Sequence, residues 1–244
     1  MLNNISKTTL KQLMIDYNFT LNSFEDNLII TEIKNSKDSR FFNNDMIFRL
    51  LIYKNHIIIS TTKELKDAFV NLFKDSTSAW FLNYRNLKAI DNKLLRFGFK
   101  IFEIKEYFTP KDDSFIKSSN LKQYNNLEIL NFKGDDRFDE AFAFNKDTPD
   151  ILGISYIENE EILGMSGVSL DSKYLYQIGI NVSSKSRSKN IGTILVSNIK
   201  NEVLKINKVP FYGTSLSHLE SQKVALKSGF LPEFIEITSI KKAD

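Results

Sequence analysis

The chain contains no cysteine and only two histidines, His56 and His218, among its 244 residues. A chain without cysteine has no disulfide, no thiolate zinc site, no iron–sulfur ligation and no cysteine nucleophile, and two histidines are too few for a multi-histidine metal cage. We therefore expect no metal cofactor. No apolar run approaches the ~20 residues that cross a bilayer, so we also expect no membrane segment.

The amino-terminal sequence MLNNISKTTLKQL has neither the basic start nor the apolar core of a signal peptide. A cytoplasmic location is therefore the expectation, and its reducing conditions suit a chain without cystine. With 42% hydrophobic, 12% aromatic and 26% charged residues, the composition is that of an ordinary globular protein.

A large excess of one charge sign is also missing. The net charge of +3 divides into +4 for residues 1–120 and −1 for residues 121–244. Neither part contains a run of lysine and arginine interleaved with aromatic residues, which is the pattern that binding to a phosphate backbone requires. The sequence therefore argues against a nucleic-acid partner.

Glycine is scarce in the first half of the chain, where only Gly98 of the nine glycines precedes residue 134. This change in composition falls beside residues 109–126, a polar segment that reads TPKDDSFIKSSNLKQYNN and is typical of an interdomain linker. The sequence thus predicts two domains, residues 1–120 and residues 121–244.

The first domain is predicted to be α+β. Apolar residues at helical spacing indicate three helices and β-rich runs indicate four strands. The helices fall near residues 10–17, 64–72 and 87–97, the second behind a capping box of Thr61 and Glu64, and the strands at 27–34, 46–53, 56–61 and 99–108. His56 is interpreted as a histidine at a strand end and Trp80 as a core or interface residue. We assign no chemistry to this domain.

The second domain is predicted to have the order β-α-β-β-β-α-β-α-β, with an antiparallel meander at its centre. The strands are expected at 127–132, 151–157, 162–170, 174–183, 210–216 and 230–240, and the helices at 136–145, at 191–205 and behind a capping box of Ser217 and Glu220. A mixed, mostly antiparallel sheet flanked by helices is the expected fold class.

The most informative segment runs from Ile178 to Thr193, where a strand leads through a short polar loop directly into a long helix. The first amides of a helix have no partner inside the helix and lie at the positive end of its dipole, so they can bind a phosphate or pyrophosphate. Gly192 lets an anion approach the backbone, and Asn190 tolerates a positive φ. The loop adds the cations Lys185, Arg187 and Lys189.

This segment resembles motif A of the GNAT superfamily of acetyl-CoA-dependent N-acetyltransferases, which reads Gln/Arg-x-x-Gly-x-Gly/Ala after a strand ending in apolar-x-Val. Here Ile180-Asn181-Val182 ends the strand, and Arg187-Ser188-Lys189-Asn190-Ile191-Gly192 forms the loop. Asn190 stands where the first motif glycine is usual.

A second motif supports the resemblance, because GNAT chains often read Asn-x-x-Ser, then tyrosine four residues later, then Gly-Phe. This chain has His218, Ser221, Ala225 and the pair Gly229-Phe230 at that spacing. The resemblance covers about residues 127–240. A separate domain before the acetyltransferase core is found in a branch of this superfamily, and residues 1–120 could be a degenerate copy of the same fold.

The resemblance implies that acetyl-CoA, as a co-substrate, lies where two neighbouring strands splay apart. The implied cofactor-binding residues are Ile180, Val182, Arg187, Ser188, Lys189, Asn190, Ile191, Gly192 and Thr193. Gly179, inside the first of these strands, would mark either a bulge that assists the splay or close packing.

The usual general acid of the superfamily is the tyrosine of the second motif, and here that position is Ala225. The candidate replacements are His218, Ser221 and Tyr212, each of which could equally be a helix cap or a sheet-facing residue. The implied function is transfer of an acetyl group to a primary amine of a small molecule or protein. The alternative is a non-catalytic acyl-CoA-binding regulatory module. The acceptor and the oligomeric state stay open.

Overall fold

The computed structural model describes residues 2–42, 45–186 and 189–243. The chain divides into two compact units, each built from two stretches of sequence. The α5 unit comprises Met1–Thr9 and Phe108–Pro232, and the α3 unit comprises Leu10–Tyr107 and Glu233–Asp244. The domain boundary near residue 120 stays a prediction. The strand expected at the end of the second domain contributes most of its residues to the α3 unit.

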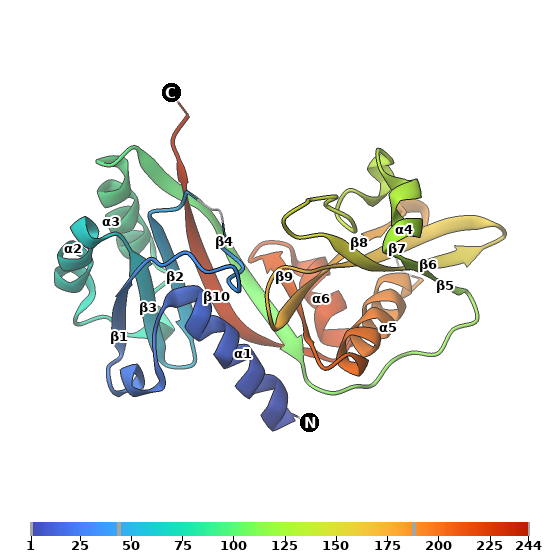
Figure 1. Cartoon of the computed structure of the whole chain (residues 1–244), viewed down its shortest axis with the longest axis horizontal. Helices are drawn as coiled ribbons and strands as arrows, with labels where there is room; N and C mark the ends of the chain where they lie inside the picture. The colour runs from blue at the N-terminus through green and yellow to red at the C-terminus, as the bar shows by residue number, and fades with distance from the viewer. Residues whose placement is uncertain (1, 43–44, 187–188, 244) are drawn as a thin grey trace. The chain divides into compact units, whose positions relative to one another are not determined.

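The α3 unit is a five-stranded sheet covered by helices on both faces (Figure 1). Its strand order is β1-β3-β2-β10-β4, with β1 parallel to β3 and with β2 antiparallel to both β3 and β10. Its elements are α1 (Leu2–Tyr17), β1 (Leu28–Glu32), β2 (Phe48–Tyr53), β3 (His56–Thr61), α2 (Lys63–Phe73), α3 (Tyr84–Leu95), β4 (Phe99–Pro110) and β10 (Phe230–Lys241). The first residues of α1 and β10 and the last of β4 are assigned to the α5 unit.

The two faces of this sheet carry separate apolar clusters because side chains alternate along each strand. Phe69 of α2 and Ile90 of α3 pack against one face, and Leu13 and Tyr17 of α1 pack against the other. The three predicted helices and four predicted strands are all present. The predicted capping box is not, because Thr62 is the N-cap of α2 and the hydroxyl of Thr61 donates to the carbonyl of Ile47 at 2.8 Å.

The α5 unit contains the strands β9-β8-β7-β6-β5 in this order, antiparallel except for the parallel pair β8 and β9. Its elements are β5 (Leu121–Asn125), α4 (Asn126–Ile129), β6 (Asp150–Glu158), β7 (Glu161–Ser169), β8 (Leu175–Val182), α5 (Ile191–Lys205), β9 (Val209–Ser215) and α6 (Leu219–Lys227). Helices α5 and α6 lie on one face, and α4 with the segment after it lies on the other (Figure 1). The mixed, mostly antiparallel sheet flanked by helices confirms the predicted fold class.

Two predicted elements of this unit are wrong. Residues 127–132 form no strand, because Asn125 caps α4 and forms a capping box with Glu128, which turns the chain into a helical segment. The strand lies earlier, in β5, within the segment that we interpreted as a linker. Of the helix expected at 136–145, only a 3₁₀ turn at Asp136–Phe138 is formed.

The part of the predicted linker that precedes β5 is attached to α5 by several hydrogen bonds. The amide of Ile116 donates to Ser197 Oγ at 3.2 Å, and its carbonyl accepts from Asn198 Nδ2 at 2.8 Å. Lys200, whose side chain is fully buried, reaches Asp112 at 3.3 Å. The linker therefore lies along the α5 helix.

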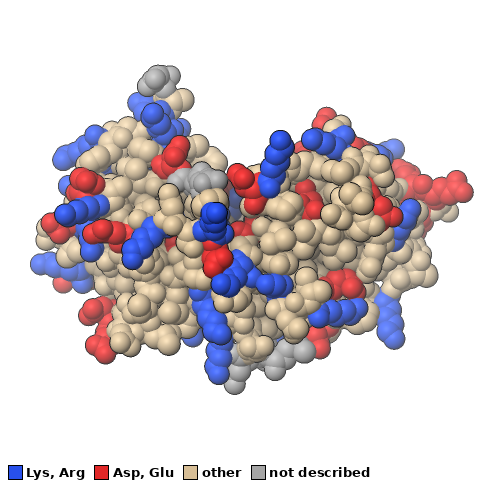
Figure 2. Space-filling view, in the orientation of Figure 1, with Lys and Arg blue, Asp and Glu red and all other residues tan. Residues whose placement is uncertain are grey.

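Among the described residues, no helix has the length and apolar character needed to cross a membrane. On the face shown in Figure 2, lysine and arginine side chains are interspersed with aspartate and glutamate side chains, and neither sign forms a broad continuous area.

Candidate functional site

Strands β8 and β9 separate after a short parallel ladder. Their pairing covers Leu175–Gln177 against Val209–Phe211, whereas β8 continues to Val182 and β9 to Ser215. Over the continuation, β8 pairs with β7 on its other edge, through Val182 opposite Gly164. The edge of β8 that faces β9 therefore offers backbone N–H and C=O groups beyond Gln177. Two neighbouring strands thus splay apart at the place where the resemblance implied a splay.

The splayed end of β8 leads directly into the N-terminus of α5. Asn190 is the N-cap, with a φ of +62°, and its side chain makes no capping hydrogen bond within the described residues. The first turn of α5 thus presents backbone amides at the positive end of a helix of 15 residues. The left-handed conformation fits the tolerance of asparagine for positive φ.

Of the three cations of the loop, the structure describes Lys185 and Lys189. Lys185 is exposed, and Lys189 forms an ion pair with Glu158 at the end of β6, with 2.9 Å between Nζ and Oε2. This hydrogen bond and the charge of Glu158 raise the pKa of Lys189. The predicted site residues Arg187 and Ser188 lie outside the described residues. An anion at the α5 N-terminus would compete with Glu158 for Lys189.

Three more predicted site residues, Ile191, Gly192 and Thr193, are buried in the first turn of α5. The side chains of Ile191 and Thr193 are buried in the unit. A Cβ at Gly192 would point towards Val224, Ile180 and Val182 at 3.4–3.7 Å, which are ordinary packing distances. A side chain at Gly192 would therefore point into the core. The prediction that its absence lets an anion approach the backbone does not fit this direction.

A segment around Glu140 crosses the sheet on the face opposite α5. It passes over a row of three glycines that pair directly across neighbouring strands: Gly153 of β6, Gly167 of β7 and Gly179 of β8. A Cβ at Gly167 or Gly179 would lie 2.0 Å from the backbone oxygen of Ala141 or Glu140. Only glycine permits this close approach. The register of β7 and β8 is unbroken at Gly179, so close packing is right and the bulge is wrong.

Asn181 of β8 holds the same segment in place. Its Oδ1 accepts hydrogen bonds from the amides of Glu140 and Ala141 at 3.0 and 2.7 Å, and its Nδ2 donates to Asp139 at 3.0 Å. Glu140 is exposed and lies over Gly179, where β8 has already parted from β9. The fold thus fixes a carboxylate-bearing residue beside the splay.

We expect Gly179→Ala to lower the free energy of unfolding by about 1–3 kcal/mol, because the added Cβ must displace the backbone of Glu140. Gly192→Ala is the matched control: its Cβ meets neighbours at ordinary distances, and alanine favours a helix over glycine by up to ~1 kcal/mol. Urea unfolding of both variants measures the difference. Equal changes would show that the segment over Gly179 yields without cost.

The candidate acids Tyr212 and Ser221 are brought together. The Tyr212 hydroxyl and Ser221 Oγ are 2.8 Å apart, joining β9 to the first turn of α6. Tyr212 is the first residue of β9 beyond the ladder with β8. Burial raises the pKa of Tyr212, the hydrogen bond from Ser221 opposes this, and the charge of Glu140 adds to the rise. The phenol is therefore protonated at neutral pH.

The third candidate, His218, is separate from this pair. It is exposed, and it is the N-cap residue of α6 without a side-chain capping bond. The predicted capping box is absent, because the Ser217 and Ser215 hydroxyls bond to each other at 3.0 Å and Glu220 pairs with Lys223. Ala225 is fully buried, so a tyrosine side chain would not fit at this position without displacing core residues.

Sequence reasoning gave no role to Asn181 or Glu140. A polar residue between Ile180 and Val182, at the end of an apolar strand, is the one signal that could have singled out Asn181. Glu140 has no such signal, because its position depends on a backbone that crosses three strands.

No protein-family model matches the chain, and no curated protein matches it either. Several solved structures are similar to it. An acetyltransferase of the GNAT family from Colwellia psychrerythraea is 10% identical, covering 59% of this chain and 57% of its own, with a TM-score of 0.42. A GCN5-related N-acetyltransferase-like protein from Streptococcus suis is 14% identical, covering 64% of this chain and 68% of its own, with a TM-score of 0.44.

A tandem GNAT protein from the clavulanic acid biosynthesis pathway is also similar, at 11% identity and a TM-score of 0.43. It covers 58% of this chain and 54% of its own. The chain therefore spans between 54% and 68% of the length of these three structures. At these identities the likeness concerns the fold alone.

Proposed function

We propose that the chain is an N-acetyltransferase that moves an acetyl group from acetyl-CoA to a primary amine of a small molecule or protein. The observation that carries this proposal is the parting of β8 and β9 after Gln177, directly before the N-terminus of α5. The residues at this junction are those that resemble motif A of the GNAT superfamily. The motif and the geometry thus support the same ligand.

In this proposal the free edge of β8 pairs with the amides of the pantetheine arm, through the backbones of Ile180 and Val182. The pyrophosphate binds at the start of α5, where amides of the first turn meet the dipole of the helix. The full set of residues proposed for this role is Ile180, Val182, Arg187, Ser188, Lys189, Asn190, Ile191, Gly192 and Thr193.

The transfer needs one proton acceptor and one proton donor. The amine must first lose a proton from its ammonium form, and we assign the Glu140 carboxylate to receive it, directly or through water. The amine nitrogen then attacks the thioester carbon, the carbon–sulfur bond breaks, and the Tyr212 hydroxyl protonates the departing thiolate. Ser221, hydrogen-bonded to Tyr212, orients the phenol.

The test combines binding and turnover on the full chain. Calorimetry is expected to give a micromolar dissociation constant for coenzyme A. A thiol-release assay with acetyl-CoA over a panel of amines, with the Glu140→Gln variant in parallel, then measures transfer. Absence of heat at hundredfold higher ligand contradicts the proposed site. Binding without turnover on any amine identifies the alternative, a non-catalytic acyl-CoA-binding regulatory module.

Arg187→Ala is expected to weaken coenzyme A binding by about 1.5–3 kcal/mol, the usual strength of a charge-assisted hydrogen bond. The matched control is Arg137→Ala, because Arg137 is exposed and is paired with its near neighbour Asp135. Calorimetry on both variants gives the difference. Equal affinities would mean that Arg187 does not contact the phosphates.

A further inference from the structure

A buried arginine in the α3 unit lacks partners for one edge of its side chain. Arg49 of β2 is 2% exposed, and neither its Nε nor its Nη2 forms a hydrogen bond with the described residues. These two nitrogens point their hydrogens to the same side of the guanidinium. It is the edge with which arginine holds both oxygens of a carboxylate in parallel. A buried charged donor without an acceptor is unfavourable, so this edge calls for a ligand.

Two more unpartnered donors lie beside it. Ser60 of β3 and Thr238 of β10 are the direct cross-strand neighbours of Arg49. Both are buried, and within the described part of the chain their hydroxyls have no hydrogen-bond partner. Opposed residues on adjacent strands have Cβ atoms roughly 5 Å apart and share a face of the sheet. One row across three strands therefore carries four unpartnered polar atoms.

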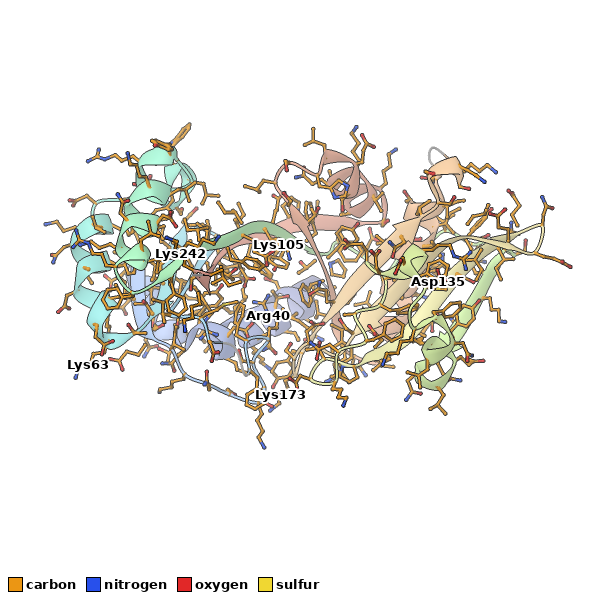
Figure 3. All side chains as sticks on the ribbon, turned by 90° about the horizontal axis from the view of Figure 1, so that it is seen from above. Arg40, Lys63, Lys105, Asp135, Lys173 and Lys242 are labelled. Carbon is orange, nitrogen blue, oxygen red and sulfur yellow. The ribbon has the colours of Figure 1, made fainter. Side chains whose placement is uncertain are left out.

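A second arginine on the same face of the sheet donates its hydrogen bonds to buried carboxylates. Arg40, labelled in Figure 3, donates from Nε to Asp16 at 2.6 Å and from Nη1 and Nη2 to Glu236 at 3.2 and 2.5 Å. Both carboxylates are thus engaged by Arg40. Burial lowers the pKa of Arg49, and the charges of Asp16 and Glu236 offset this only in part. These two charges do not replace a hydrogen-bond acceptor in direct contact with Nε and Nη2 of Arg49.

Aromatic rings cover the guanidinium of Arg49 without occupying its edge. Its Cζ lies 4.6 Å from the centre of the Phe41 ring and 5.9 Å from that of Tyr17. Cation–π packing of this kind uses the plane of the guanidinium and leaves the N–H groups for a ligand in that plane. A planar ligand with two acceptor oxygens matches the two parallel N–H donors of this edge.

We propose that Arg49, Ser60 and Thr238 form a binding site for a small monocarboxylate. One carboxylate oxygen accepts from Nε and the other from Nη2 of Arg49, and the two hydroxyls donate to the remaining lone pairs. All three residues belong to the α3 unit, whereas the residues of the acetyl-CoA site proposed above belong to the α5 unit.

Charge decides which anion is favoured. Asp16, Arg40 and Glu236 together carry one net negative charge, and Arg49 balances it. A bound monocarboxylate leaves the cluster with one net negative charge, and a phosphate dianion would leave two. In a buried cluster this difference is costly, so a carboxylate is preferred to phosphate. The same charge keeps the affinity modest, in the millimolar range.

The test follows the Nε–Hε resonance of Arg49 by ¹⁵N–¹H NMR of the full chain, assigned by its loss in Arg49→Lys. Sodium acetate is titrated to about 100 mM at constant ionic strength, in parallel with acetamide, sodium chloride and sodium phosphate. Acetate is expected to move the resonance in a saturable way. Acetamide and chloride are expected to leave it in place, and phosphate to move it at least threefold less.

Thermal unfolding supplies a second readout. Acetate is expected to raise the melting temperature of the wild type and of Arg96→Lys, an exposed control in the same unit, but not that of Arg49→Lys. Lysine keeps the charge and loses the planar fork. Should Arg49→Lys fail to fold, Ser60→Ala is expected to raise the half-saturating acetate concentration at least threefold. A linear response to acetate, or an equal response to acetamide or chloride, would overturn the proposal in favour of a site filled by water.

Discussion

Tyr212→Phe is expected to lower the rate of acetyl transfer by about 10²- to 10⁴-fold, the usual contribution of a general acid, and to leave coenzyme A binding unchanged. The thiolate that leaves acetyl-CoA needs a proton, and Ala225 has none to give. Burial raises the pKa of Tyr212, so its hydroxyl holds a proton at neutral pH. Phenylalanine keeps the buried ring and removes the hydroxyl group that would donate this proton.

The control is Ser221→Ala, which breaks the same 2.8 Å hydrogen bond but leaves the phenol in place. Loss of this bond alone is expected to cost about 1 kcal/mol of stability in either variant. Thiol release and calorimetry on both variants separate the roles. If Tyr212→Phe transfers acetyl groups as fast as the wild type while His218→Ala does not, the acid is His218. If Tyr212→Phe, His218→Ala and Ser221→Ala all keep the wild-type rate, water protonates the thiolate.

Local sequence signals predicted the elements around this site well. Helix α5 begins at Ile191 and ends at Lys205, as predicted, because a polar loop with a residue suited to positive φ stands before an amphipathic run. The meander β6, β7 and β8 was also predicted, since its turns are marked by polar residues such as Asn159 and Glu160, which both adopt positive φ. Such features depend on residues close together in the sequence.

The errors also have local causes. The apolar residues between Leu127 and Phe132 have the composition of a strand, but Asn125 and Glu128 form a capping box that starts a helix there. The residue types of this capping box can be read from the sequence, and they favour a helix where we predicted a strand. The strand β5 was missed because Leu121–Asn125 has a single buried residue, Tyr124, and reads as a polar linker.

The tertiary contacts of the site could not be predicted from one sequence. The row Gly153, Gly167 and Gly179 acquires its meaning from strand register, and its partner segment at Glu140 reaches it only in the folded chain. Arg40 meets Glu236 across 196 residues of sequence. No local pattern specifies such pairs, and a single sequence offers no covariation between them.

The Arg40 cluster gives the largest expected effect on stability. Arg40→Met is expected to lower the free energy of unfolding by about 3–5 kcal/mol, because it removes the cation that Asp16 and Glu236 contact directly and leaves two buried carboxylates with the single charge of Arg49. The side chains of the three residues are 6%, 0% and 2% exposed, in the order Arg40, Asp16 and Glu236. Urea unfolding monitored by circular dichroism measures the change from the midpoint and the slope.

Arg137→Met is the matched control, since Arg137 also pairs with an aspartate at 2.6 Å but is 65% exposed. A solvated pair of this kind contributes at most about 1 kcal/mol, so little change is expected. Adding Glu236→Gln to Arg40→Met is expected to recover much of the loss, because the buried carboxylate that remains, Asp16, is then balanced by Arg49. If the double variant is no more stable than Arg40→Met alone, the cost comes from lost packing of the Arg40 side chain against Phe41, Tyr107 and Phe234 and not from charge.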